Sequence, residues 1–117
     1  MRRELVLLTE MIDAAEQATA LVAGVDLTAV EADRQRRDAL LWNFTVLGEA
    51  AAQLPAEVKV RFPEVPWARP SQLRNRIVHG YWAIDVSILH ATATDLLPGF
   101  TAQVRDVLAQ LEADDGG

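Results

Sequence analysis

The sequence predicts an all-α protein, an up-and-down bundle of four to five helices, on three observations. Apolar residues recur at helical spacing through most of the 117 residues. Prolines and glycines interrupt this pattern at a few places and divide the chain into helix-length segments. No stretch alternates apolar and polar residues over the length of a strand. Helices joined by short links are typical of such a bundle.

The first two helices are predicted over residues 2–23 and 29–53. Gly24 is a natural stop for the first, because glycine tolerates the left-handed backbone that ends many helices. Thr28 and Glu31 have the spacing of a capping box at the start of the second.

The long second helix has two apolar faces. One face consists of Leu40, Phe44, Leu47, Ala51 and Leu54, and the other of Trp42, Val46 and Ala50. One small bundle does not need both faces, and surplus apolar surface usually marks an interface, so we expect a homodimer. Gly48 in the helix interior predicts a close approach by another helix.

The second half of the chain is predicted from its prolines and caps. A short helix follows Pro55, and residues 63–70 hold three prolines that exclude one regular helix. The third main helix is predicted over 70–79, with Pro70 at its first position and Gly80 as its stop.

Asp85 is the expected N-cap of a last helical run, which Pro98 should kink or divide. The expected organisation is one domain over residues 1–113 and a frayed polar tail over 114–117.

Composition limits the function. The net charge of −6 and pI of about 4.8 argue against a protein that coats nucleic acid by general electrostatics. The absence of cysteine excludes disulfides, zinc–thiolate sites and thiol catalysis. Acidic residues interrupt the apolar run at the N-terminus, so we expect no signal peptide, no membrane span and a cytoplasmic location.

The charge is unevenly distributed, however. Residues 68–80 contain Arg69, Arg74 and Arg76 and no acid, whereas residues 85–117 contain six acids against Arg105. An isolated basic patch of this kind suits one phosphate group or a few, held by guanidinium groups.

His79, one of two histidines, stands in this patch. On a helix it shares a face with Asn75 and Arg76, and it lies about 140° around the axis from Arg74. A long arginine side chain can still bring its guanidinium near the imidazole, most easily if His79 stands at the fraying end of the helix. At the C-terminal end of a helix, the dipole favours the cationic imidazole, which helps it to donate a proton. A histidine beside phosphate-binding arginines is a minimal set for cleaving RNA without a metal or another cofactor.

Spacing alone leaves ordinary explanations open. A histidine at a helix end often serves in capping or packing, flanking arginines are commonly a solvated face, and Tyr81 and Trp82 could be core anchors.

Arg74-Asn75-x-x-x-His79-x-Tyr81 resembles the R-x4-H-x-Y signature of the HepT-like branch of the HEPN superfamily of helical-bundle ribonucleases. The segments ADRQRRDALLWNFTVLGEAA at 32–51 and FPEVPW at 62–67, and the YWAID and DLLP segments after the signature, are also similar to this family. The resemblance covers about residues 2–101. Arg69-Pro70-Ser71 departs from the family pattern just before the signature.

The resemblance implies a metal-independent endoribonuclease, the toxin of a toxin–antitoxin pair, acting as a homodimer whose two signatures meet in one cleft. By that resemblance, Arg74 would stabilise the scissile phosphate and His79 would be the acid/base, with Asn75 and Arg76 in support. The implied partner is a minimal nucleotidyltransferase antitoxin that transfers AMP to Tyr81.

Glu49 is either a partner for an arginine of the cleft or a boundary acid that faces solvent, and the sequence assigns no role to His90. Two alternatives stay open: a non-catalytic helical dimer that binds a nucleotidyltransferase or a nucleotide, and a purely structural bundle.

Overall fold

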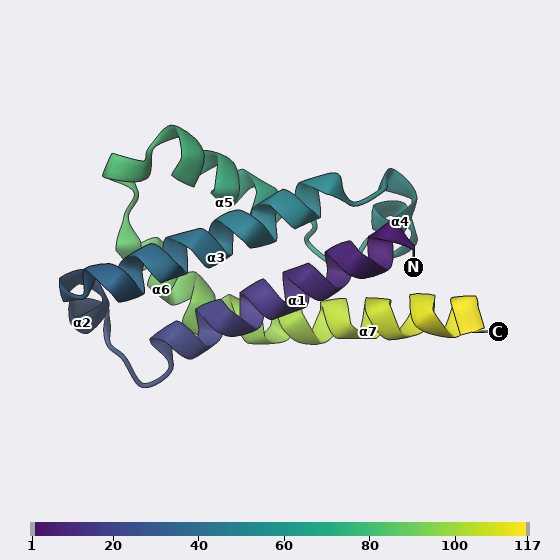
Figure 1. Cartoon of the computed structure of the whole chain (residues 1–117), viewed down its shortest axis with the longest axis horizontal. Helices are drawn as coiled ribbons and strands as arrows, with labels where there is room; N and C mark the ends of the chain where they lie inside the picture. The colour runs from purple at the N-terminus through teal and green to yellow at the C-terminus, as the bar shows by residue number, and fades with distance from the viewer. Residues whose placement is uncertain (1, 117) are drawn as a thin grey trace.

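The computed structural model describes residues 2–116, which form an all-α bundle, as predicted, with no strand in that range. Four helical runs alternate in direction (Figure 1). They are α1 (Arg3–Val22), α3 (Arg34–Gln53), α5 (Ala68–His79), and a last run made of α6 (Val86–Ala91), the π-helical η2 (Thr92–Leu96) and α7 (Leu97–Gly116). Shorter elements connect them: α2 (Leu27–Ala32), α4 (Ala56–Arg61) and the 3-10 turn η1 (Tyr81–Ala83).

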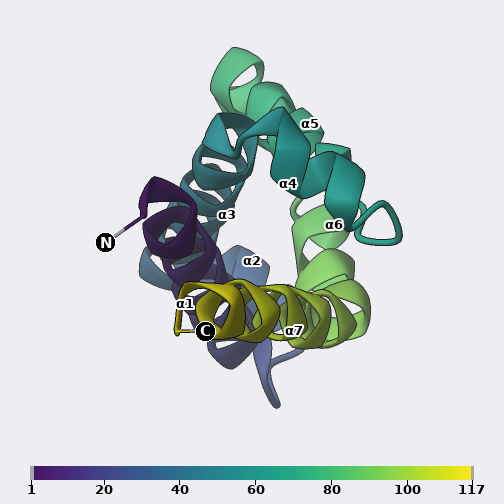
Figure 2. The ribbon, with the colours of Figure 1, turned by 90° about the vertical axis from the view of Figure 1, so that its right-hand side faces the viewer.

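The core lies where α1 packs against both α3 and α7. Leu8, Leu40, Phe44, Leu47 and Val104 are among its fully buried side chains. The helix α5 packs chiefly on α3, and Figure 2 shows it on the side of the bundle away from α1 and α7. The helix that carries the candidate site is therefore attached to the fold mainly by one face.

The single helix predicted over 29–53 is wrong, because the structure has two helices there. Asp33 has an extended backbone, and its side chain accepts a hydrogen bond from the Arg36 N–H, which caps α3. The predicted capping box is also wrong: Asp26, whose side chain accepts from the Ala29 N–H, caps α2. Aspartate competes well for such cap positions, so it ends one helix and starts the next within an otherwise helical pattern.

The helix predicted over 70–79 begins two residues earlier, at Ala68. Pro70 is its third residue, a position where the missing N–H costs nothing because the first-turn amides have no partner within the helix. The end at His79, followed by Gly80, is confirmed. Before this helix, the buried Trp67 ring donates its Nε1–H to the Phe62 carbonyl at 2.9 Å.

The last run confirms the predicted cap and irregularity. Asp85 accepts a hydrogen bond from the Ser87 N–H at 2.9 Å. The π-helical segment ends just before Pro98, whose missing N–H and ring disturb the preceding turn. The helix α7 reaches Gly116, and the division into a domain over 1–113 and a tail over 114–117 stays a prediction.

The predicted second apolar face of α3 is only partly free. Trp42 is 66% exposed, Val46 is half-buried and Ala50 is buried in the core. Trp42 is thus the main surplus apolar group of that face, and the homodimer stays a prediction. Within residues 2–116, no helix combines the length and apolar character needed to cross a membrane.

Candidate active site

The helix α5 crosses α3 at Gly48, as the glycine predicted. A Cβ atom added at Gly48 would lie 2.2 Å from the Arg74 Cβ and 2.4 Å from the Pro70 carbonyl oxygen. Real Cβ atoms do not approach other atoms this closely, so only glycine permits this spacing of the two helices. Gly48 therefore sets the position of the Arg74 backbone.

Arg74 lies along the surface of α3. Its guanidinium forms an ion pair with Glu49, with 3.3 Å between Nη1 and Oε2, and its side chain is 25% exposed. The Arg74 Nε is buried and has no hydrogen-bond partner within residues 2–116. Glu49 also accepts a hydrogen bond from Gln53 at 3.1 Å. The expectation that Glu49 contacts an arginine of the site is confirmed. Most of the Arg74 side chain is buried, so it does not face solvent freely.

His79 is the last residue of α5, and its side chain is exposed. Asn75, one turn earlier, is exposed as well. Because both Arg74 and His79 belong to the helix, the angle between them stays about 140°. In the described part of the chain, no hydrogen bond or ion pair joins Arg74 to His79. One copy of the chain thus presents the two groups on different sides of α5.

Tyr81 follows in the turn η1, and its hydroxyl donates a hydrogen bond to Asp38 on α3 at 3.1 Å. Partial burial raises the pKa of the Tyr81 phenol, and the bond to the Asp38 carboxylate raises it further, while Arg34 and Arg37 act in the opposite direction. The hydroxyl is therefore protonated at neutral pH and donates its hydrogen bond to the Asp38 carboxylate.

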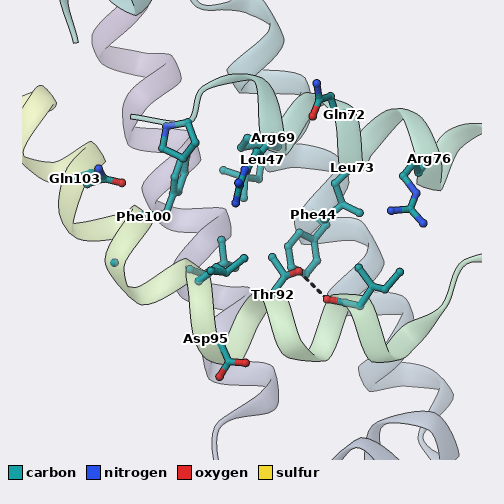
Figure 3. A pocket seen from close by; sticks show the side chains of 16 residues that line it. Phe44, Leu47, Arg69, Gln72, Leu73, Arg76, Thr92, Asp95, Phe100 and Gln103 are labelled. Carbon is teal, nitrogen blue, oxygen red and sulfur yellow. Dashed lines mark hydrogen bonds between the residues drawn. The ribbon is translucent and has the colours of Figure 1, made fainter. Parts of the chain in front are cut away.

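Arg76 lies on the side of α5 opposite Arg74. It is exposed, and its charge, after the hydrogen bonds from Ser87, helps to lower the pKa of the Asp85 carboxyl. Arg76 also lines a cavity of about 530 Å³ between α5 and the run from α6 to α7. Figure 3 shows Arg69 and Arg76 entering from α5, Asp95 opposite them, and Phe44 and Phe100 among the apolar lining residues.

A second, smaller cavity of about 290 Å³ lies on the opposite side of α5, against α3. Trp42, Val78 and Tyr81 line it together with Asp38. The three arginines of the basic segment are therefore divided: Arg69 and Arg76 face the larger cavity, while Arg74 is held by Glu49.

Two features escaped sequence reasoning. Asp38, the partner of Tyr81, is 43 residues away in the chain, and no local pattern marks it. Tyr81 and Trp82 were open to a reading as core anchors, but both are exposed.

His90 bonds the Val25 carbonyl through Nε2 at 2.8 Å, and so joins α6 to the connection before α2. Among residues 2–116, no group of three or more His, Asp or Glu side chains is placed to hold a metal ion.

The fold and this site define a helical-bundle protein with a basic, histidine-ended helix on its surface. The family model described as "Ribonuclease HepT-like" matches residues 11–107. The chain therefore belongs to the ribonuclease HepT-like family, which confirms the resemblance seen in the sequence and supports an RNase activity.

Curated relatives agree with this membership. The chain is 26% identical over 91 residues to a Thermococcus cleftensis protein named "Probable ribonuclease HepT", covering 78% of this chain and 80% of that protein. It is 25% identical over 83 residues to a Methanocaldococcus jannaschii protein with a provisional RNase name, covering 71% and 69% respectively. A Caldanaerobacter subterraneus protein with a similar provisional name is 25% identical over 87 residues, covering 74% and 78%. No solved structure matches the chain significantly.

Proposed function

We propose that this protein is a metal-independent endoribonuclease, with Arg74 and His79 as its catalytic residues. The observation that carries the proposal is the complete Arg74-x4-His79-x-Tyr81 signature on the exposed helix α5 of a HepT-like ribonuclease. Asn75 and Arg76 are the supporting residues. Asn75 is one turn from His79, and Arg76 contributes positive charge on the side of α5 opposite Arg74.

The proposed reaction begins with attack of a ribose 2′-oxygen on the adjacent phosphorus. The P–O5′ bond breaks, and the products carry a 2′,3′-cyclic phosphate and a 5′-hydroxyl. His79 takes the proton from the 2′-hydroxyl or gives one to the leaving 5′-oxygen. Arg74 stabilises the charge that builds on the phosphoryl oxygens, and Glu49 holds the Arg74 guanidinium until the phosphate arrives.

The direct test is incubation of the purified protein with RNA in excess EDTA, followed by analysis of the new RNA ends. Cleavage that persists in EDTA and leaves cyclic phosphates supports the proposal. Cleavage that stops in EDTA and returns with added metal contradicts the metal-independent mechanism.

We propose further that the active form is a homodimer. Arg74 and His79 of one copy lie on different sides of α5, so a second copy is needed to bring an Arg74 and a His79 to one phosphate. The exposed Trp42 supplies apolar surface for an interface.

Light scattering at micromolar concentration is expected to give the mass of a dimer. Trp42→Glu should lower this mass towards that of one chain, because a carboxylate would lose its hydration in the interface. Circular dichroism should show the same helix content as wild type, since Trp42 is 66% exposed in one copy. A wild-type protein with the mass of a single chain would refute the composite site.

Tyr81 is the proposed control point of a toxin–antitoxin pair. A minimal nucleotidyltransferase would direct the Tyr81 oxygen onto the α-phosphorus of ATP, forming a tyrosyl–AMP bond and releasing pyrophosphate. Asp38 is placed to take the phenolic proton, because it already accepts the hydrogen bond from the Tyr81 hydroxyl. A bulky anionic group two residues from His79 would obstruct the site and repel RNA.

Tyr81→Phe should keep most of the nuclease activity, because the ring still packs and both catalytic side chains are unchanged. It should escape inhibition, because phenylalanine has no oxygen to accept AMP. Intact mass and RNA cleavage are measured after mixing each protein with the partner nucleotidyltransferase, ATP and Mg²⁺. Equal mass additions on both proteins would place the acceptor elsewhere, and no addition on either would favour inhibition by binding alone.

A second function has one observation in its favour. The Arg74 guanidinium is already engaged by Glu49, and His79 is directed elsewhere, as in a helical dimer that binds a nucleotidyltransferase or a nucleotide without cutting RNA. The EDTA experiment separates the two functions, because only the nuclease generates new RNA ends.

A further inference from the structure

Trp82 is the most exposed large apolar residue of the described chain. Its side chain is 96% exposed, whereas Trp67 is 5% exposed and satisfies its ring N–H inside the protein. Burial of an aromatic ring is strongly favourable, so a tryptophan left almost wholly in water usually has a binding partner.

The Trp82 ring is held in place by the turn around it. The Ala83 N–H donates to the Gly80 carbonyl at 2.9 Å, which closes the turn η1. The Tyr81 ring meets the Trp82 ring edge to face, with centroids 5.4 Å apart and an interplanar angle of 80°. Tyr81 is in turn attached to α3 through Asp38. The turn η1 follows the end of α5 at the periphery of the molecule (Figure 1), and the Trp82 ring that it carries is 96% exposed to solvent.

The surrounding charges favour a polyanion. Residues 68–84 contain no acid, and Trp82 comes three residues after His79. The nearest acids, Asp38 and Asp85, each accept a hydrogen bond within the protein. Arg34 and Arg37 on α3 add positive charge beside the neighbouring Tyr81. Single-stranded nucleic acid fits both the basic segment and the exposed ring, since its phosphates are attracted to basic groups and its bases stack on aromatic faces.

We propose that Trp82 is a stacking platform for an unpaired RNA base next to the cleaved bond. The proposal rests on the proposed ribonuclease function and adds the form of its substrate, which is single-stranded at this position. A paired base cannot offer its face to the ring, because its neighbours in the duplex already cover it.

The test compares wild type with Trp82→Phe, Trp82→Leu and Trp82→Ala. The probes are a single-stranded oligoribonucleotide of fixed sequence and the same oligonucleotide with 2′-deoxy sugars throughout, which has no 2′-hydroxyl to react. The Leu and Ala variants should weaken binding of the deoxy probe roughly 5- to 100-fold and raise KM to match, with kcat at saturation little changed. Phe, which keeps an aromatic face, should retain most of the affinity. Val60→Ala, at an apolar position on α4 that is 77% exposed, is the control.

The outcomes separate the alternatives. Equal affinity of wild type and Trp82→Leu, or equal losses with Leu and Phe, would overturn the stacking platform. A change of oligomeric mass in the Leu variant would make Trp82 a contact between copies and also overturn it. If wild type binds the deoxy probe but cleaves no RNA, the nuclease proposal fails while the stacking test can still be read. A wild type that neither binds nor cleaves overturns both.

Discussion

His79→Ala is expected to abolish RNA cleavage while the protein stays folded. General acid/base catalysis by one side chain contributes about 10²- to 10⁴-fold, so the rate in excess EDTA should fall by at least that range. The side chain of His79 is exposed and forms no hydrogen bond within the described chain, so its truncation should change the free energy of unfolding by under about 0.5 kcal/mol. Single-turnover cleavage and thermal unfolding measure the two effects.

His90→Ala is the matched control, because it removes the other histidine of the chain. His90 bonds the Val25 carbonyl, so this variant should lose some stability and keep its cleavage rate. A wild-type rate in His79→Ala would assign the acid/base to another group. Arg74→Ala should also lose activity. It is a less specific test of catalysis, because the Arg74 side chain also packs over Gly48 and pairs with Glu49.

Gly48→Ala is expected to be the most disruptive single-methyl change in the chain. The new carbon would lie 2.2 Å from the Arg74 Cβ and 2.4 Å from the Pro70 carbonyl, so α5 must move away from α3. Overpacking of this kind costs about 1–3 kcal/mol or more, despite the higher helix propensity of alanine. The displacement also moves Arg74, so cleavage should fall further than stability alone explains. Urea unfolding and cleavage rates, measured under conditions where the variant is fully folded, test both parts.

Gly99→Ala adds the same methyl group where it meets nothing within 4 Å. It lies in α7, so it should be neutral or slightly stabilising. If Gly48→Ala were as stable and active as Gly99→Ala, the close crossing of α3 and α5 would not set the position of Arg74.

Local patterns predicted most of the fold because they act over a few residues. The stop at Gly24 has the positive φ of 70° that glycine tolerates, and Asp85 caps the last helical run. Gly48 predicted a close helix crossing, since no other property of that position favours glycine inside a helix. The break at Asp33 was missed because residues 33–38 are all polar, so no apolar spacing there shows where one helix ends and the next begins.

The candidate site could be predicted as a list of residues but not as an arrangement. The signature residues are close in sequence, so reading them needed no tertiary structure. The bond between Tyr81 and Asp38 joins residues 43 positions apart, which no spacing rule reaches. The exposure of Trp82 was also unpredictable, because hydrophobicity alone favours burial and only the fold shows that the ring stays 96% exposed.

The attachment of α5 to α3 by one face has an energetic consequence. A helix with a 530 Å³ cavity on its other side detaches by breaking its contacts with α3 and the short turn η1, so it can open while α1, α3 and α7 stay packed. A ligand that binds only when α5 is packed on α3 binds only that fraction of the molecules. Its apparent affinity is therefore its intrinsic affinity multiplied by the fraction in which α5 is packed. A partner that fills the cavity would raise that fraction without touching Arg74 or His79. Binding of RNA and binding of this partner would then be linked through the same opening equilibrium. The factor by which the partner raises the affinity for RNA must equal the factor by which RNA raises the affinity for the partner.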